Sequence, residues 1–379
     1  MIKKTKTAKV IKVAKVTKES KTAKTIKVTK AAIIIIALQL LSWTLLACAW
    51  RVAGFSDWWA AHVFRWWTAV AGTVFGVFPF SVAEFVLYLL IIWAVGSLVL
   101  AVRHRHFQCV RFLLAASVLW FLFVACSGIN YQRTSFTDSA GIEMKEYTLT
   151  ELKETCLWLT QKVNEYSVLV ERDEDGIMQL SLTQYGTGQL AAQAMEELGD
   201  TYPLLSGSYP TPKPVTFSKI LSLLSLTGVY SPLTIEANYN REMTAYNIPY
   251  SMCHELSHLW GFMQEQEANF IAFLACTGSE NADFCYSGYM LAWIQCTNAL
   301  YDASRADFSE VRELLSEKAQ LDLTENTAFW NTHEGVLSEV SDQVNDTYLK
   351  ANGQSDGVLS YEKAVDLLVS YWMENYEDG

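Results

Sequence analysis

One short segment, residues 253–261, carries the residue types that a catalytic metal site needs. It reads Cys-His-Glu-Leu-Ser-His-Leu-Trp-Gly, so His254 and His258 are four positions apart. On a helix, this spacing projects both imidazoles from one face, at a separation that a single Zn²⁺ can bridge. Glu255 lies beside the first ligand and can reach a water at the metal without occupying a coordination position. We therefore predict that Glu255 is the catalytic residue.

A third ligand is expected from the residues that follow, because a catalytic zinc site takes three protein ligands and keeps one position open. Gly261 is expected to end the first helix and turn the chain back. Glu265 and Glu267 then compete for the metal, since two residues two apart on a helix cannot both point at it. Glu265 is favoured because Asn269, four residues on, shares its face and could orient a histidine ligand. Glu267 stays as the alternative ligand.

A group that stabilises the developing oxyanion is normally also required in such hydrolysis. His333 is the first candidate because it is the only other histidine after the membrane section. Tyr348, Tyr361 and Arg305 are further candidates. A structural or surface role is the simpler interpretation of each of them.

The elements that position these residues include an N-terminal part of the chain that is expected to be a membrane anchor. Residues 1–30 hold eleven of the 29 Lys and Arg and are interpreted as a basic cytoplasmic tail. Three stretches with at most one charge follow, near residues 31–50, 81–102 and 112–129, each long enough to cross a bilayer as a helix. A cleavable signal peptide is the alternative for the first stretch. The basic loop between the last two stretches is expected in the cytoplasm, which puts everything after residue 130 outside it.

Residues 57–78 need a separate interpretation. Two Trp pairs, eight positions apart, stand here among charged residues, and the uncharged part is short for a span. Aromatic residues at helical spacing predict an amphipathic helix on the outer membrane surface. A fourth span is the alternative, and it would reverse the final topology.

Residues 131–379 are expected to form an extracytoplasmic domain. They hold 37 of the 40 acidic residues against 13 basic ones, which argues against a nucleic-acid partner. A capping box at residues 148–151 predicts a helix, helical patterns continue from about residue 250, and the alternation in residues 233–240 predicts a strand. The expected fold class is mainly α, a helical membrane anchor followed by a mostly helical α+β domain with a small sheet.

The site motif resembles that of the gluzincin metallopeptidases. His254-Glu255-Leu256-Ser257-His258 is followed by Glu265-Gln266-Glu267-Ala268-Asn269. In gluzincins a Glu on the next helix is the third ligand, and a residue four later, usually Asp, supports a His. This chain has Asn269 at that place and an unusually short connection between the two helices.

The resemblance implies a zincin-like domain in which His254, His258 and Glu265 hold Zn²⁺. It also implies that Glu255 takes the proton of a zinc-activated water that attacks a peptide carbonyl. The strand at residues 233–240 would then be the edge strand that aligns an extended peptide. An ordinary strand that packs on the helices is an equal alternative.

A wider pattern resembles the bacterial domain-of-unknown-function family 3810 over about residues 31–375. It comprises the three spans, Tyr230-Ser231-Pro232-Leu233, Glu236-Ala237-Asn238, Ile248-Pro249, Asn345-Asp346-Thr347-Tyr348-Leu349-Lys350 and Ser360-Tyr361. The family has no established function, so this resemblance bears on fold, membrane location and zinc site more than on substrate.

Two functions follow as hypotheses. The first is a multi-pass membrane protein with a zinc metallopeptidase domain outside the cytoplasm, whose partners are membrane lipid and a peptide or protein substrate. The second is a non-catalytic receptor or scaffold with a structural zinc. Proteolysis inside the membrane is disfavoured because the polar residues 264–267 follow the motif so closely.

Overall fold

The chain divides into two compact units, each built from two stretches of sequence. The first combines Met1–Val52 with Leu87–Ala125, and the second combines Ala53–Val86 with Cys126–Gly379. The structure, a computed structural model, describes residues 29–104, 109–352 and 360–376. The expected basic tail lies almost wholly outside the described residues, as do residues 105–108 of the expected basic loop.

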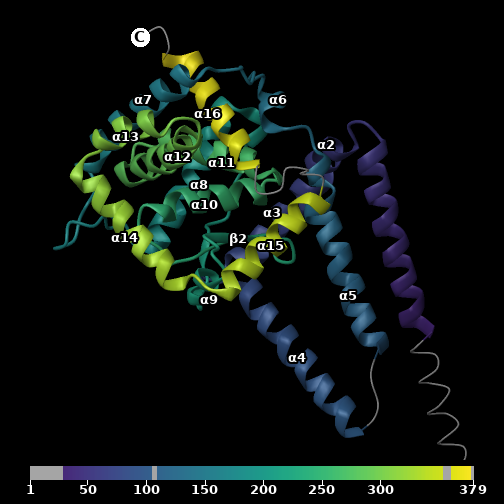
Figure 1. The fold of residues 1–379 in the computed structure, drawn as a ribbon. Coiled ribbons are helices and arrows are strands. Elements are labelled where there is room, and N and C mark those ends of the chain that lie inside the picture. The colour runs from purple at the N-terminus through teal and green to yellow at the C-terminus, as the bar shows by residue number, and fades with distance from the viewer. Residues whose placement is uncertain (1–28, 105–108, 353–359, 377–379) are drawn as a thin grey trace, which may run out of the picture. The chain divides into compact units, whose positions relative to one another are not determined.

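Three helices in the described part of the chain are long and apolar enough to cross a membrane. They are Thr29–Arg51, Val82–Arg103 and Cys109–Gln132. The second lies within α4 (Val82–His104), and the third begins with α5 (Cys109–Phe123) (Figure 1). Within the first unit, Gln39 Nε2 donates a hydrogen bond to Ser117 Oγ at 3.1 Å, which joins the first and third of these helices. The three expected spans are confirmed as helices of membrane length, which indicates membrane association.

The segment expected as an interfacial helix belongs to the second unit. It forms α2 (Phe55–Trp59), a π-helical turn η1 (Ala60–Phe64) and α3 (Arg65–Gly76). Phe64 is buried, and Arg65 donates to the Leu204 carbonyl at 2.7 Å. Trp58 and Trp66 remain exposed. The segment therefore packs one side on the rest of the second unit and exposes Trp58 and Trp66 on the other, and it adds no fourth helix of spanning length.

Helices make up most of the second unit. They are α6 (Phe136–Ala140), α7 (Leu149–Ser167), α8 (Gln184–Thr201), α9 (Ser218–Leu223), α10 (Asn247–Leu259), α11 (Glu265–Thr277), α12 (Ala282–Ala303), α13 (Arg305–Glu313), α14 (Glu317–His333), α15 (Val336–Ala351) and α16 (Ser360–Tyr376), with short turns η2 (Val124–Gly128), η3 (Asn130–Gln132) and η4 (Pro203–Leu205). Helix α7 begins at the predicted capping box of Thr148 and Glu151. In the core, α12 packs against α7 and α11, and α11 packs against α10 and α16 (Figure 1). The prediction of a mainly helical fold with a small sheet is confirmed.

The sheet has three short strands in the order β1-β3-β2, with β1 at Lys213–Pro214, β2 at Gly228–Ser231 and β3 at Glu236–Tyr239. Strand β3 runs parallel to β1 and antiparallel to β2. The expected strand at residues 233–240 thus exists, but the expectation that it is an edge strand is wrong, because both of its sides are already paired. The edge beside the site belongs to β2. The alternation of residues in one strand does not indicate which strands pair with it, so the sequence could not predict the strand order.

Candidate metal centre

Helix α10 carries both histidines of the motif, and the turn after it brings back the third residue of the site. Pro249 lies in the first turn of α10, where its missing N–H costs no helical hydrogen bond. Gly261 follows the helix with a φ of +94°, a left-handed conformation that glycine adopts without strain. Helix α11 then begins at Glu265, so its first side chain returns to the histidine face of α10.

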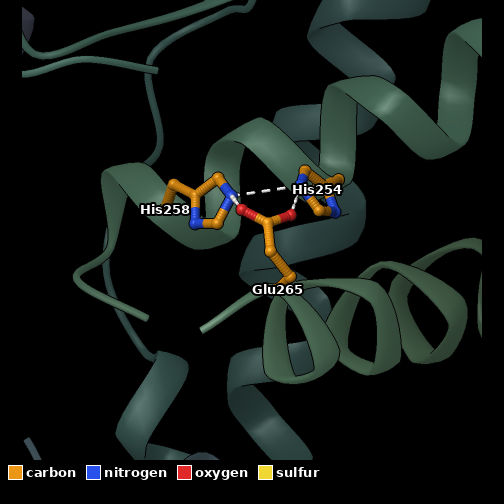
Figure 2. A group of neighbouring side chains, drawn as sticks. All are labelled: His254, His258 and Glu265. Carbon is orange, nitrogen blue, oxygen red and sulfur yellow. Dashed lines mark hydrogen bonds and ion pairs between the residues drawn. The ribbon is translucent and has the colours of Figure 1, made fainter. Parts of the chain in front are cut away.

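His254, His258 and Glu265 form a cluster that could hold a metal ion. Figure 2 shows the Glu265 carboxylate between the two imidazoles, 3.3 Å from His254 Nε2 and 3.5 Å from His258 Nε2. The two Nε2 atoms are 3.0 Å apart. In a tetrahedral zinc site with bonds near 2 Å, neighbouring ligand atoms are about 3.3 Å apart. The shorter distance is to Glu265 Oε2 and the longer one to Oε1, so each imidazole nitrogen and its nearest carboxylate oxygen already have about the separation of neighbouring zinc ligands.

The His258 ring is oriented by the turn that follows its own helix. Its Nδ1 lies 2.8 Å from the Phe262 carbonyl oxygen, which can only accept a hydrogen bond. Nδ1 must therefore carry the proton, which leaves Nε2 as the metal-binding nitrogen of the neutral ring. From the sequence, Asn269 was expected to orient a histidine ligand in this way. A backbone carbonyl supplies it for His258, and no residue type signals that in a sequence.

Attraction between the histidines and the Glu265 carboxylate holds the cluster together. Burial disfavours the charged form of His258, but Glu265, Glu255 and the Phe262 carbonyl outweigh it and raise the histidine pKa to about 9. Burial also opposes the charge of Glu265, yet His258 and His254 hold the pKa of that carboxyl well below its usual range. Glu265 is therefore an anion, as a metal ligand must be.

Glu255 is buried next to the cluster with one oxygen unsatisfied. Its Oε2 has no hydrogen-bond partner among the described residues. Burial raises the pKa of Glu255 to about 6, while His254 and His258 act in the opposite direction. A Cβ added to Gly228 would lie 2.6 Å from Glu255 Oε1, so β2 passes directly over this carboxylate. A buried carboxylate with a free oxygen and a pKa near neutrality suits a general base.

A pocket of about 610 Å³ opens over the cluster. Its wall includes the edge strand β2, the loop before it, α10, α11 and one side of α15; the polar and charged lining residues are Ser127, Tyr131, Ser225, Thr227, Tyr230, Asn247, Tyr250, Ser251, His254, Glu255, His258, Glu265, Asn269, Gln295, Ser341, Asp342, Asn345 and Tyr348. None of the lining residues is Lys or Arg. The pocket is thus polar, and its only formal charges other than those of the histidines are negative.

The other predicted site residues lie in different places. Glu267 points away from the cluster, where its carboxylate accepts hydrogen bonds from the Thr137 N–H at 3.2 Å and the Thr137 hydroxyl at 3.0 Å. Asn269 lines the pocket, and its Nδ2 has no partner among the described residues. His333 lies at the end of α14, with its Nδ1 2.8 Å from the Phe329 carbonyl, and it does not line the pocket.

Two tyrosines complete the pocket wall near Glu265. The hydroxyl of Tyr131 donates to that of Tyr348 at 3.1 Å, and both residues line the pocket. From the sequence, Tyr348 was only a further candidate for stabilising the oxyanion, and Tyr131 was not a candidate. No sequence signal pairs them, because they are 217 positions apart.

The fold and the cluster together define a class: a membrane-associated helical protein with a His-His-Glu candidate metal centre in its second unit. Residues 59–369 match the family DUF3810, described as "Protein of unknown function", and the chain belongs to that family. The match includes the whole candidate metal centre. No curated protein and no solved structure matches the chain.

Proposed function

We propose that this protein is a membrane-anchored, zinc-dependent peptidase whose active site is the pocket over His254, His258 and Glu265. The observation that carries the proposal is Glu255 Oε2, a buried carboxylate oxygen with no partner among the described residues, beside a cluster of two imidazoles and a carboxylate that could hold a metal ion. A metal that served only structure would need no such group. An unsatisfied buried carboxylate is costly unless function requires it.

His254, His258 and Glu265 would hold the ion. Two imidazoles and one carboxylate suit Zn²⁺ and leave one coordination position for chemistry. When bound, zinc supplies Lewis-acid chemistry at this place.

Glu255 performs the proton transfers in the proposed reaction. Its Oε2 accepts a proton from the water that attacks the peptide carbonyl, and the same carboxyl then delivers this proton to the leaving amine. The carboxyl can do both because its pKa of about 6 lies close to neutrality.

Tyr131 and Tyr348 are our candidates for stabilising the oxygen of the attacked carbonyl. Their hydroxyls lie on the pocket wall and can donate hydrogen bonds to an oxygen that becomes negative. They replace His333 in this role, because His333 lies outside the pocket lining.

The test measures metal and activity separately on the full chain in lipid nanodiscs. Metal content is determined by mass spectrometry, and activity on a library of quenched fluorescent peptides. We expect one zinc per chain and peptide cleavage in the wild type, zinc without cleavage in Glu255→Gln, and neither in His258→Ala. His333→Ala is the matched control, which should keep both.

Two results would contradict the proposal. Stoichiometric zinc with no cleavage of any peptide, indistinguishable from Glu255→Gln, would favour the non-catalytic receptor. A wild-type chain that binds no zinc would contradict both the zinc peptidase and the zinc-containing receptor.

A further inference from the structure

The sheet beside the pocket is bonded to the beginning of a membrane-length helix. The buried carboxylate of Glu236, on β3, accepts hydrogen bonds from the N–H groups of Val82 at 3.2 Å and Ala83 at 2.7 Å. These N–H groups belong to the first turn of α4, which has no helical partners for them. Lys213, on β1, binds the same carboxylate at 2.6 Å. The sheet therefore caps the helix that continues as the second expected span.

The first turn of α4 also binds the chain segment between β1 and β2. Glu84, also in the first turn of α4, accepts hydrogen bonds from the N–H groups of Thr216 at 2.8 Å and Phe217 at 3.0 Å. Phe217, directly before α9, and Ile220, on α9, are 60% and 51% exposed. Two large apolar side chains thus point outward next to the end of a membrane-length helix.

The end of the third membrane-length helix forms part of the pocket itself. Ser127 and Tyr131 lie in its last turns and line the pocket. The Tyr230 hydroxyl, from β2, donates to the Cys126 carbonyl at 3.2 Å. The edge strand, the metal cluster and the outer end of this helix therefore share one cavity.

Helix α15 contributes a second exposed apolar surface beside the pocket. One side of α15 lines the pocket with Ser341, Asp342, Asn345 and Tyr348. The neighbouring side carries Val336, Leu337, Val340 and Val344, each between 50% and 74% exposed. The Tyr348–Tyr131 hydrogen bond ties α15 to the end of the third membrane-length helix. We call Phe217, Ile220, Val336, Leu337, Val340 and Val344 the apolar rim.

We infer that the apolar rim rests in the outer leaflet of the membrane and that the pocket receives peptide segments directly adjoining a membrane anchor. This inference rests on the proposed function and names its substrate class: juxtamembrane segments of membrane-anchored polypeptides. The bilayer is the occupant of the rim because the rim continues from the ends of two membrane-length helices. A water-exposed helix would not present Val, Leu and Val along one side.

Charge favours a peptide over a lipid headgroup inside the pocket. A phospholipid carries an anionic phosphate, which proteins bind with Arg, Lys or helix N-termini. The lining has carboxylates at Glu255, Glu265 and Asp342 and no Lys or Arg. The edge of β2 that faces away from β3 instead offers backbone groups to an extended chain.

The test captures ligand without requiring hydrolysis. A benzophenone amino acid replaces Val229, an exposed residue on β2, in full-length Glu255→Gln protein reconstituted in phosphatidylethanolamine and phosphatidylglycerol vesicles. The probe is a peptide library of random sequence in three forms: free, palmitoylated directly next to the random segment, and palmitoylated with a flexible spacer of about 40 residues, whose ends lie roughly 35 Å apart. After irradiation, cross-linked peptide is quantified for each form.

We expect the directly anchored form to cross-link about tenfold more than the free form, because the anchor concentrates the peptide at the pocket mouth. The double substitution Val340→Glu with Val344→Glu should remove most of this advantage, since charge is disfavoured in lipid. Gln161→Glu, at an exposed position of α7 outside both the apolar rim and the pocket lining, is the matched control for added charge and should keep it.

Three results would overturn the inference: equal capture of the free and directly anchored forms, capture only with the long spacer, or cross-linking of the lipid in place of peptide. Hydrolysis by the chain with an intact Glu255 is scored separately. Selective capture of the directly anchored form without cleavage refutes the proposed hydrolysis and supports the juxtamembrane inference.

Discussion

At the residue scale, the three candidate ligands hold one another in place through charge and hydrogen bonds. Glu265 contacts both imidazoles, and the Phe262 carbonyl keeps the proton on His258 Nδ1. A metal would therefore meet ligands that need little rearrangement, but it would have to displace a proton from His258 Nε2.

The first prediction concerns the pH dependence of zinc binding. The pKa of His258 is raised to about 9, so below that pH the metal-free ring is protonated and must lose a proton to bind zinc. Affinity should rise as pH increases from 6 towards 9. Titration calorimetry at pH 7 in two buffers with different ionisation enthalpies should show proton release, and its absence would contradict the assigned charge state.

The second prediction separates the two glutamates of α11. Glu265→Gln should weaken zinc binding by at least about tenfold, because the ligand anion is lost. Glu267→Gln should retain zinc and reduce the free energy of unfolding by about 1 kcal/mol, because its carboxylate binds Thr137 at the start of α6. Zinc titration and thermal unfolding of both variants measure this, and loss of zinc in Glu267→Gln alone would reverse the ligand assignment.

At the scale of elements, the site depends on one close crossing of a strand over a helix. Gly228 of β2 lies so near Glu255 of α10 that a side chain would collide with the carboxylate and with the Asn238 carbonyl, 2.9 Å from the added Cβ. The strand therefore limits where the Glu255 side chain can point.

The third prediction follows from this crossing. Gly228→Ala should displace Glu255 and lower peptidase activity by about 10²-fold, comparable with the contribution of a general base. Zinc content should stay at the wild-type level, because no ligand is touched. Gly335→Ala is the control, since a Cβ there meets no atom within 4 Å. Full activity in Gly228→Ala would show that this approach does not position Glu255.

At the scale of the whole molecule, the division into two units follows the membrane-length helices. Among the described residues, the first unit holds the first of these helices and most of the other two. The second unit combines Ala53–Val86 with Cys126–Gly379 and so includes the start of the second helix and the end of the third. Such a division is expected when the chain leaves the bilayer twice on the same side, since residues 53–86 and 126–379 can then pack together.

The fourth prediction is the orientation of the chain. A reporter fused after Gly379 should be outside the cytoplasm, because the basic residues precede the first span and lie between the second and third. Alkaline phosphatase fused there should be active and green fluorescent protein dark. The opposite pair of results would reject the orientation and place the pocket in the cytoplasm.

Local patterns in the sequence determined a large part of this protein. The three membrane-length helices follow from runs of apolar residues, and α7 follows from Thr148 and Glu151 at its start. His254, His258 and Glu265 come together because of helical periodicity and one glycine turn. All the residues that cause this lie within a stretch of twelve positions. Each of these features was accessible because its cause lies in a short stretch of chain.

Tertiary structure alone decided the surroundings of the cluster. It paired Tyr131 with Tyr348, placed Gly228 against Glu255 and turned Glu267 away to Thr137. It also made β3 a central strand and left β2 as the edge beside the pocket. These outcomes depend on which distant segments pack together, and packing partners are selected by the shape and burial of the whole unit, which no local pattern encodes.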